Sequence, residues 1–172
     1  EEKRDLDNDG QIEDGEVVRS YTIGDVILAQ AGADGSTLYL ISDGHGSTRL
    51  ALDMAAAQPA SGVSRFAYDA YGNALGFDAS AAATSVLYSG QLFDKSTGLQ
   101  FLRARYYDAG AGRFTQSDPF AGYLDWPLTL ADYAYVGGDP VNWVDPSGLY
   151  IYWLPFMAGA QGYAAGLAMT VT

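Results

Sequence analysis

The chain has 172 residues, of which 48% are hydrophobic and only 17% charged, and this composition excludes an intrinsically disordered chain. The formal net charge of −12 argues against nucleic-acid binding, because an acidic surface repels phosphate groups. The absence of cysteine excludes disulfide bridges, thiolate metal sites and thiol catalysis. Since the chain starts at Glu1 and shows no signal peptide, we expect it to be a piece of a longer protein.

Residues 1–17 are polar and acidic and contain the first motif. The segment Asp5-Leu-Asp-Asn-Asp-Gly-Gln-Ile-Glu-Asp-Gly-Glu16 fits the twelve-residue calcium loop, whose sharp turn is made by a glycine. The segment that follows, Val17 to Tyr21, is typical of a strand rather than of the helix of an EF-hand. We therefore predict a solitary calcium loop, with a solvated acidic linker as the alternative. The predicted ligands of the calcium ion are Asp5, Asp7, Asp9, Gln11 and Glu16.

Short apolar segments alternate with turn-forming residues from residue 18 onward. The 21 glycines and 13 tyrosines suit many short strands joined by tight turns. Residues 53–62 are rich in alanine and are expected to form a helical turn or a loop. The predicted strands, in chain order, are Ser20–Gln30, Thr37–Ile41, Ser47–Leu52, Phe66–Tyr68, Val86–Tyr88, Leu99–Tyr107 and Arg113–Gln116.

A weak internal repeat underlies these strands. Each unit has a strand, an aspartate, a short loop that ends in glycine, and another strand. Aspartate accepts hydrogen bonds from the amides of its own loop, and glycine adopts the left-handed conformation. Because an isolated hairpin is marginally stable, the units must stack, and the sequence predicts an all-β fold of antiparallel β-hairpin repeats. An ordinary β-sandwich is the alternative. The four loops are Asp43–Gly46, Asp69–Gly72, Asp94–Gly98 and Asp108–Gly112.

Three segments resemble the RHS/YD-repeat family. The stretch Phe66-Ala-Tyr-Asp-Ala-Tyr-Gly72 resembles a YD repeat. The stretches Gly98-Leu-Gln-Phe-Leu-Arg-Ala-Arg-Tyr-Tyr-Asp108, with Gly112-Arg-Phe-Thr-Gln-Ser-Asp-Pro119, and Tyr133-Ala-Tyr-Val-Gly-Gly-Asp-Pro-Val-Asn-Trp-Val-Asp-Pro-Ser-Gly-Leu149 resemble the RHS-repeat-associated core signature. Similar proteins include bacterial Rhs and Tc-toxin C components, wall-associated YD-repeat proteins and the teneurins.

The resemblance implies a β-sheet that spirals into a hollow shell, closed at one end by the RHS core, around a variable C-terminal segment that is often a toxin. This chain carries only the last few repeats, so it cannot build a complete shell. It divides into an acidic calcium-loop segment at residues 1–17, the RHS core at 18–149, and an apolar tail at 150–172, where the variable effector of related proteins begins.

The resemblance also implies a cleavage site. In shell-forming relatives, two aspartates in Asp-Pro motifs act like an aspartic protease and cut the chain after the motif leucine. The matching residues are Asp118 and Asp145, with the cut between Leu149 and Tyr150. Two close carboxylates share a proton, so one can activate water while the other protonates the leaving group. The alternative is that both aspartates only cap backbone amides in Asp-Pro turns.

Other polar residues have weaker predicted roles. Arg105 and Arg113 either support the aspartate pair or bind structural carboxylates. His45 is the single histidine and lies between two glycines, so we predict a structural turn residue. Residues 150–172 contain no charged residue and are long enough to span a bilayer, but we favour burial of this tail in protein over membrane contact.

Two functions are compatible with these features. The first is the C-terminal RHS core of a secreted or cell-surface shell protein, capping the shell and cutting its own chain as an aspartic-type autoprotease. The second is a processed, non-catalytic subunit of an extracellular homo-oligomeric or filamentous assembly. The expected partners are upstream YD repeats or further copies of the chain, and the C-terminal effector segment. Calcium is the expected cofactor.

Overall fold

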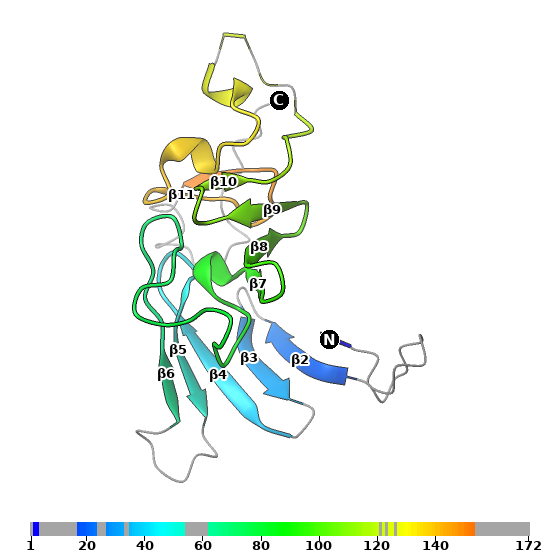
Figure 1. The fold of residues 1–172 in the computed structure, drawn as a ribbon, viewed down its shortest axis with the longest axis vertical. Helices are drawn as coiled ribbons and strands as arrows, with labels where there is room; N and C mark the ends of the chain where they lie inside the picture. Colours follow the sequence, from blue (N-terminus) through cyan, green and yellow to red (C-terminus); the bar gives the residue numbers. More distant parts are fainter. Residues whose placement is uncertain are drawn as a thin grey trace.

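The computed structural model describes residues 2–3, 17–23, 27–32, 35–53, 62–120, 122, 124–125 and 127–153. Within these residues the regular elements are antiparallel strands and short 3-10 helices, which confirms the predicted all-β fold class. Figure 1 shows a six-stranded sheet with a four-stranded sheet beyond one end of it. The residues that precede and follow the predicted cleavage site form a third, two-stranded sheet.

The six-stranded sheet has its strands in sequence order, and the four-stranded sheet has the order β10-β9-β8-β7. The first sheet comprises β1 (Glu2–Lys3), β2 (Val17–Ile23), β3 (Ile27–Gly32), β4 (Thr37–Ser42), β5 (Thr48–Asp53) and β6 (Val63–Arg65). The second comprises β7 (Leu92–Asp94), β8 (Leu99–Leu102), β9 (Arg105–Asp108) and β10 (Arg113–Phe114), and the third β11 (Trp143–Val144) and β12 (Tyr152–Trp153). The 3-10 helices are η2 (Tyr88–Gly90), η3 (Pro127–Leu130) and η4 (Val136–Gly138).

Four of the predicted strands were wrong. The segment Ser20–Gln30 belongs to two strands, β2 and β3, which pair with each other antiparallel. The prediction of one strand passed over Gly24 and Asp25, which are turn-forming residue types. The segment Leu99–Tyr107 belongs to two strands, β8 and β9, which pair antiparallel on either side of Arg103, a residue with a left-handed φ of 59°.

The segment Phe66–Tyr68 contributes only an isolated bridge, from Tyr68 to Ala74. The segment Val86–Tyr88 contributes only an isolated bridge at Val86, because the chain turns into the 3-10 helix η2 at Tyr88.

The four predicted Asp–Gly loops are confirmed as turns. Their last residues, Gly46, Gly72, Gly98 and Gly112, have φ between 64° and 92°, a conformation that glycine adopts without strain. The Oδ1 atom of the first aspartate in each turn accepts at least one backbone N–H from within that turn or next to it. Hence each turn is stabilised locally by residues that are adjacent in the sequence.

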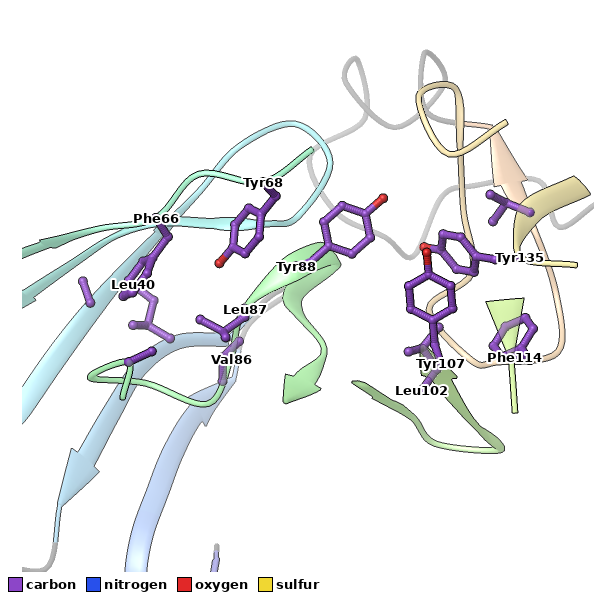
Figure 2. Close-up of a cluster of buried hydrophobic side chains, with 13 residues drawn as sticks. Leu40, Phe66, Tyr68, Val86, Leu87, Tyr88, Leu102, Tyr107, Phe114 and Tyr135 are labelled. Carbon is purple, nitrogen blue, oxygen red and sulfur yellow. The ribbon is translucent and has the colours of Figure 1, made fainter. Parts of the chain in front are cut away.

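The core runs continuously from the six-stranded sheet to the four-stranded sheet and to Tyr135 and Val136 (Figure 2). Aromatic rings make up much of it. The ring centroids of Tyr107 and Tyr135 lie 4.2 Å apart, and Phe114 packs edge-to-face against Tyr135. Edge-to-face and offset contacts between such rings stabilise a fold beyond the burial of their area. The labelled core residues are Leu40, Phe66, Tyr68, Val86, Leu87, Tyr88, Leu102, Tyr107, Phe114 and Tyr135.

His45 joins the turn after β4 to two distant segments. Its Nε2 atom lies 2.9 Å from the carbonyl oxygen of Pro140, and its Nδ1 atom lies 2.8 Å from Oγ of Ser89. A neutral ring that donates from Nε2 and accepts at Nδ1 satisfies both contacts. His45 is therefore a turn residue, as predicted, but it also connects the six-stranded sheet to the segments around Ser89 and Pro140.

We expect this histidine to make the protein less stable in mild acid. Burial lowers the pKa of His45 below its usual 6.5, although the Pro140 carbonyl and Asp43 oppose this effect, and Arg49 adds to it. As the pH falls below about 6.5, the unfolded chain takes up the proton first, so stability decreases until the pH passes the lower pKa of the folded state. Each unit of pKa difference contributes about 1.4 kcal/mol.

The measurement is urea unfolding of the chain and of His45→Gln at pH values between 8 and 5. Carboxylates titrate in both proteins, so only the difference between them reports His45. The wild type should lose more stability than His45→Gln over this range. Equal losses would show that His45 does not set this pH dependence.

Candidate functional site

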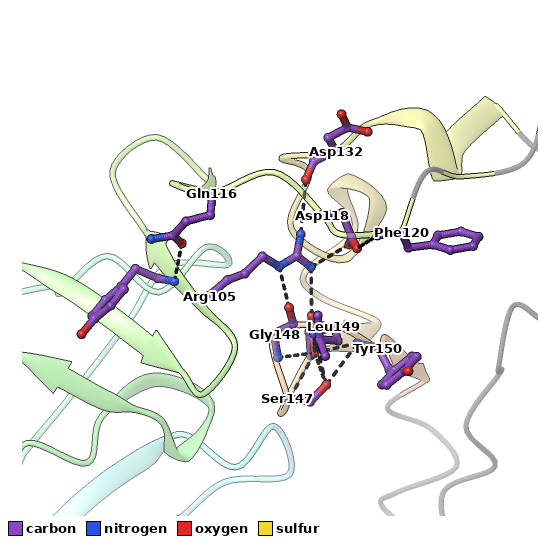
Figure 3. Close-up of polar contacts among 11 residues, drawn as sticks. Arg105, Gln116, Asp118, Phe120, Asp132, Ser147, Gly148, Leu149 and Tyr150 are labelled. Carbon is purple, nitrogen blue, oxygen red and sulfur yellow. Dashed lines mark hydrogen bonds and ion pairs between the residues drawn. The ribbon is translucent and has the colours of Figure 1, made fainter.

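Arg105, the first residue of β9, is the centre of the candidate site (Figure 3). Its side chain is only 5% exposed, and its guanidinium lies 3.7 Å from the centre of the Phe114 ring. Nε donates to the carbonyl oxygen of Gly148 at 2.5 Å, and Nη1 donates to that of Asp132 at 3.2 Å. Nη2 lies 2.9 Å from Oδ2 of Asp118. Every nitrogen of this buried cation has an oxygen partner.

The two predicted aspartates come together at this guanidinium. Asp118 follows β10 in the chain, and Asp145 directly follows β11. Their Oδ2 atoms lie 2.9 Å and 3.8 Å from the same Nη2 atom of Arg105. The side chain of Asp145 is 1% exposed and that of Asp118 is 21% exposed. The structure thus brings both carboxylates to one shared cation.

The Oδ1 atom of Asp145 organises the turn that ends at the predicted cleavage site. It accepts the backbone N–H groups of Ser147, Gly148, Leu149 and Tyr150, and the hydroxyl of Ser147, at 2.8 to 3.2 Å. The nitrogen of Tyr150 belongs to the peptide bond predicted to be cut, so Asp145 contacts that bond directly. Because donors surround Oδ1, Oδ2 is the atom of Asp145 that remains to hold a proton.

Asp118 divides its two oxygens in the same way. Its Oδ1 atom accepts the backbone N–H of Phe120 at 2.9 Å, while Oδ2 pairs with Arg105. The backbone N–H of Asp118 donates to the carbonyl oxygen of Asp132 at 2.8 Å, which ties the Asp-Pro turn to the segment that also binds Arg105. Both aspartates therefore cap turns with one oxygen and face the guanidinium with the other.

The turn between β8 and β9 holds the segment that precedes the predicted cleavage site. Arg103 donates to the carbonyl oxygen of Pro146, and the backbone N–H of Ala104 donates to that of Ser147 at 3.2 Å. Together with the bond from Arg105 to Gly148, three consecutive residues bind three consecutive carbonyls. This pattern fixes the path of the chain up to Leu149.

Gly148 is the residue that permits this close approach. Its φ of 73° lies in the left-handed region, and a Cβ atom there would overlap the carbonyl oxygen of Leu102. Both the backbone conformation and the lack of space require glycine at this position.

Burial and charge act against each other at Asp145. Burial raises the pKa of this carboxyl above its usual value, while Ser147, Arg105 and the amides of Tyr150 and Gly148 lower it. A raised pKa favours the protonated form that a shared proton requires. Burial also lowers the pKa of Arg105, and the two aspartates oppose that shift.

Arg113, the second predicted support residue, lies in a different setting. It is exposed on β10 and lines a cavity of about 380 Å³ with Asp108, Phe114, Thr115 and Tyr133. Among the ion pairs between described residues, none involves Arg113. Its exposed position gives it no contact with the aspartate pair comparable to that of Arg105.

Three predicted segments fall wholly or mostly outside the described residues: the calcium loop at residues 5–16, the alanine-rich segment at 54–61, and the apolar tail at 154–172. In the ranges that are described, no three histidine, cysteine, aspartate or glutamate side chains gather into a metal site. No helix in the same ranges is long and apolar enough to cross a membrane.

Sequence reasoning missed several groups of the site. Ser147 could have been found, because a hydroxyl two residues after an aspartate is typical of a side-chain-capped turn. Arg103, the amide of Ala104 and the carbonyl of Asp132 act through tertiary contacts, and nothing in the local sequence marks them.

Comparison with known proteins supports the resemblance noted in the sequence, although no family model matches the chain. The tRNA3(Ser)-specific nuclease WapA of Bacillus spizizenii is 34% identical over 155 residues, which cover 87% of this chain and 6% of the nuclease. The double-stranded DNA deaminase toxin A of Burkholderia cenocepacia is 42% identical over 62 residues, covering 36% of this chain and 4% of the toxin. Salivary gland surface protein 1 of Aedes aegypti is 35% identical over 111 residues, covering 63% of this chain and 3% of that protein.

Solved structures of Tc toxins share the fold. The crystal structure of TcdB2–TccC3 matches with a TM-score of 0.51 and 31% identity, over 67% of this chain and 5% of that one. The structure of TcdB2–TccC3 without the hypervariable C-terminal region matches with a TM-score of 0.56 and 26% identity, over 81% of this chain and 7% of that one. The chain thus spans a small part of every protein compared.

The hairpin architecture and the paired Asp-Pro turns define this chain as the RHS-type C-terminal region of a toxin-related protein. It belongs to the RHS-repeat/Tc-toxin C family.

Proposed function

We propose that the chain is the RHS core that caps the shell of a larger secreted or cell-surface protein and cuts its own backbone between Leu149 and Tyr150. One observation carries the proposal: both aspartates face Arg105, and one of them binds the nitrogen of that peptide bond. Asp145 is buried, whereas Leu149 and Tyr150 are 36% and 48% exposed, so water has access to the bond.

The proposed reaction is hydrolysis of the peptide bond. A water oxygen adds to the carbonyl carbon of Leu149, and one carboxylate of the pair takes the water proton. The carbon–nitrogen bond then breaks, and the nitrogen of Tyr150 receives a proton, which leaves a carboxylate on Leu149 and an amine on Tyr150. Only the Oδ2 atoms of Asp118 and Asp145 are placed to exchange the proton of the pair, because both Oδ1 atoms accept backbone N–H groups. The two carboxylates are proposed to act as a pair, so neither aspartate is assigned one step.

The test is the intact mass of the longer parent protein together with its size in solution. A chain that ends at Leu149 with a partner that begins at Tyr150 supports self-cleavage. An uncut chain in a regular oligomer supports the second candidate, a structural subunit of an extracellular assembly. The similarity to a protein named for the salivary gland surface favours keeping this second candidate.

For the acidic N-terminal segment we propose calcium binding. Its donor set consists of carboxylates and a backbone carbonyl, which are the hard oxygen ligands that calcium prefers. The residues that would hold the ion are Asp5, Asp7, Asp9, Gln11 and Glu16.

We expect chelation of calcium to loosen residues 1–17 and to leave the rest of the chain folded. Hydrogen exchange with and without a calcium chelator measures this, because only amides near the ion should exchange faster. Glu16→Gln should weaken calcium binding by at least about tenfold, since it removes the charge of the bidentate ligand. A control replacement of Glu13, at the loop's ninth position, should have a smaller effect. Equal hydrogen exchange of these amides with and without the chelator would mean that the segment is an acidic linker that does not bind calcium.

The partners follow from the capping role. Upstream YD repeats or further copies of the chain are expected to continue the six-stranded sheet beyond β1, and the C-terminal effector segment is expected to follow residue 149. Similarity to TccC3 in complex with TcdB2 favours association with other toxin components. We favour burial of residues 150–172 in protein over contact with a membrane.

A further inference from the structure

The nitrogen of Tyr150 has two oxygen neighbours that are suited to a positive charge. It lies 3.2 Å from Oδ1 of Asp145 and 3.1 Å from Oγ of Ser147. As part of an intact peptide bond it offers one hydrogen to these two oxygens. After hydrolysis it would be an α-amino group, which is protonated at neutral pH and carries three hydrogens and one positive charge.

We infer that this site captures the new α-ammonium group, so that the segment beginning at Tyr150 stays bound to the RHS core after the cut. The inference rests on the proposed self-cleavage. The ligand is by chemical class a peptide that starts with a free α-ammonium group and continues as a β-strand. Amine capture by inward-facing oxygens, and addition of a strand to a sheet edge, are both established modes of peptide recognition.

The charges around the site favour this capture. Asp118 and Asp145 face one buried guanidinium, that of Arg105, and leave one negative charge beside it when both are ionised. The guanidinium of Arg103 is exposed and binds the carbonyl of Pro146 instead.

The cut also leaves a carboxylate on Leu149, so a cation at the nitrogen of Tyr150 would face net negative charge. Because the side chain of Asp145 is only 1% exposed, water screens this interaction little. A hydrogen bond between two ionised groups is also stronger than the neutral contact that it replaces.

The backbone on both sides of the bond has attachments that do not depend on the bond itself. Upstream, the carbonyls of Pro146, Ser147 and Gly148 are bound by the β8–β9 turn. Downstream, β12 pairs with β11, with Tyr152 opposite Val144 and Trp153 opposite Trp143. Hydrolysis breaks neither set of contacts.

Two consequences follow for the protein. The cut alone does not release the downstream segment, which must still be detached from Asp145 and from β11. The captured cation also favours the ionised form of Asp145, whose Oδ1 atom lies 3.2 Å from the nitrogen of Tyr150.

The test measures the new amine in the self-cut parent protein. Reductive methylation with ¹³C-formaldehyde labels the amine of Tyr150, and NMR then gives its pKa. We expect a value about one unit above the ordinary range for an α-amino group, which corresponds to tenfold tighter proton binding. Ser147→Ala should reduce the shift. The matched control is Ser96→Ala. The backbone N–H and the hydroxyl of Ser96 donate to Oδ1 of Asp94, as those of Ser147 donate to Oδ1 of Asp145. The Asp94 turn is exposed, and no chain end lies beside it.

A second preparation separates this inference from the proposed cut. The same parent is produced as two co-expressed chains divided between Leu149 and Tyr150, with the second chain released from a fusion so that it starts at Tyr150. A raised pKa of the Tyr150 amine in this preparation supports the capture. If the single chain is never cut, that result overturns the self-cleavage but not the capture. An ordinary pKa here, or loss of the second chain on dilution, overturns the capture.

Discussion

Asp145→Asn and Asp118→Asn should each abolish the fragment that begins at Tyr150 in the parent protein. Asparagine keeps a side-chain oxygen that can accept the backbone N–H groups now bound by Oδ1, so both turns should persist. It cannot take up or give the proton that the pair exchanges. Loss of a general acid or base slows a reaction by about 10²–10⁴-fold, so an overnight incubation should leave the variants uncut.

The matched control for these variants is Asp94→Asn. Asp94 caps an exposed turn, in which its Oδ1 atom accepts the backbone N–H of Ser96, as Oδ1 of Asp145 accepts that of Ser147. Asp94 forms no ion pair with Arg105. This variant should be cut like the wild type. Thermal unfolding of all proteins would show whether the variants remain folded.

Two other results would change the interpretation. A fragment that appears equally in the wild type and in both variants would mean that Asp118 and Asp145 are turn residues only. If no fragment appears in any protein, the wild type included, the chain is an RHS cap whose tail stays covalently attached.

Local features of the fold were predictable from the sequence. The turns at Asp43–Gly46 and Asp94–Gly98 depend on an aspartate and a glycine that are close in the chain, so their residue types suffice to locate them. The strand boundaries around Gly24 were missed, since β2 and β3 have similar residue types and only a short turn signal separates them.

The site was predictable only in part, because its geometry depends on contacts between distant residues. The Asp-Pro motifs pointed to Asp118 and Asp145, but the sequence did not distinguish Arg105 from Arg113. Arg105 is buried because its position on β9 faces the core, whereas Arg113 is exposed on the edge strand β10. Likewise, His45 was recognisable as a turn residue, while its partner Pro140 lies 95 residues away.

Gly148→Ala should strongly destabilise the protein. Comparison with Gly98→Ala shows how much of the lost stability comes from crowding at the site rather than from backbone strain. Gly148 and Gly98 have nearly the same φ, 73° and 74°, so alanine is strained at both positions. That strain costs about 1–2 kcal/mol. At Gly98 an added Cβ meets nothing within 4 Å, so Gly98→Ala should cost the strain alone.

At Gly148 the added Cβ would overlap the carbonyl oxygen of Leu102 and lie 3.1 Å from the nitrogen of Arg105, and both are backbone atoms on either side of the β8–β9 turn. Backbone cannot move aside as a flexible side chain can, so overpacking should add about 1–3 kcal/mol. Urea unfolding of the two variants gives this difference directly. The shift of Gly148 would also pull its carbonyl from Arg105, so we expect less of the Tyr150 fragment from Gly148→Ala than from Gly98→Ala. Equal stabilities would mean that the β8–β9 turn yields easily and does not hold the segment before the cleavage site.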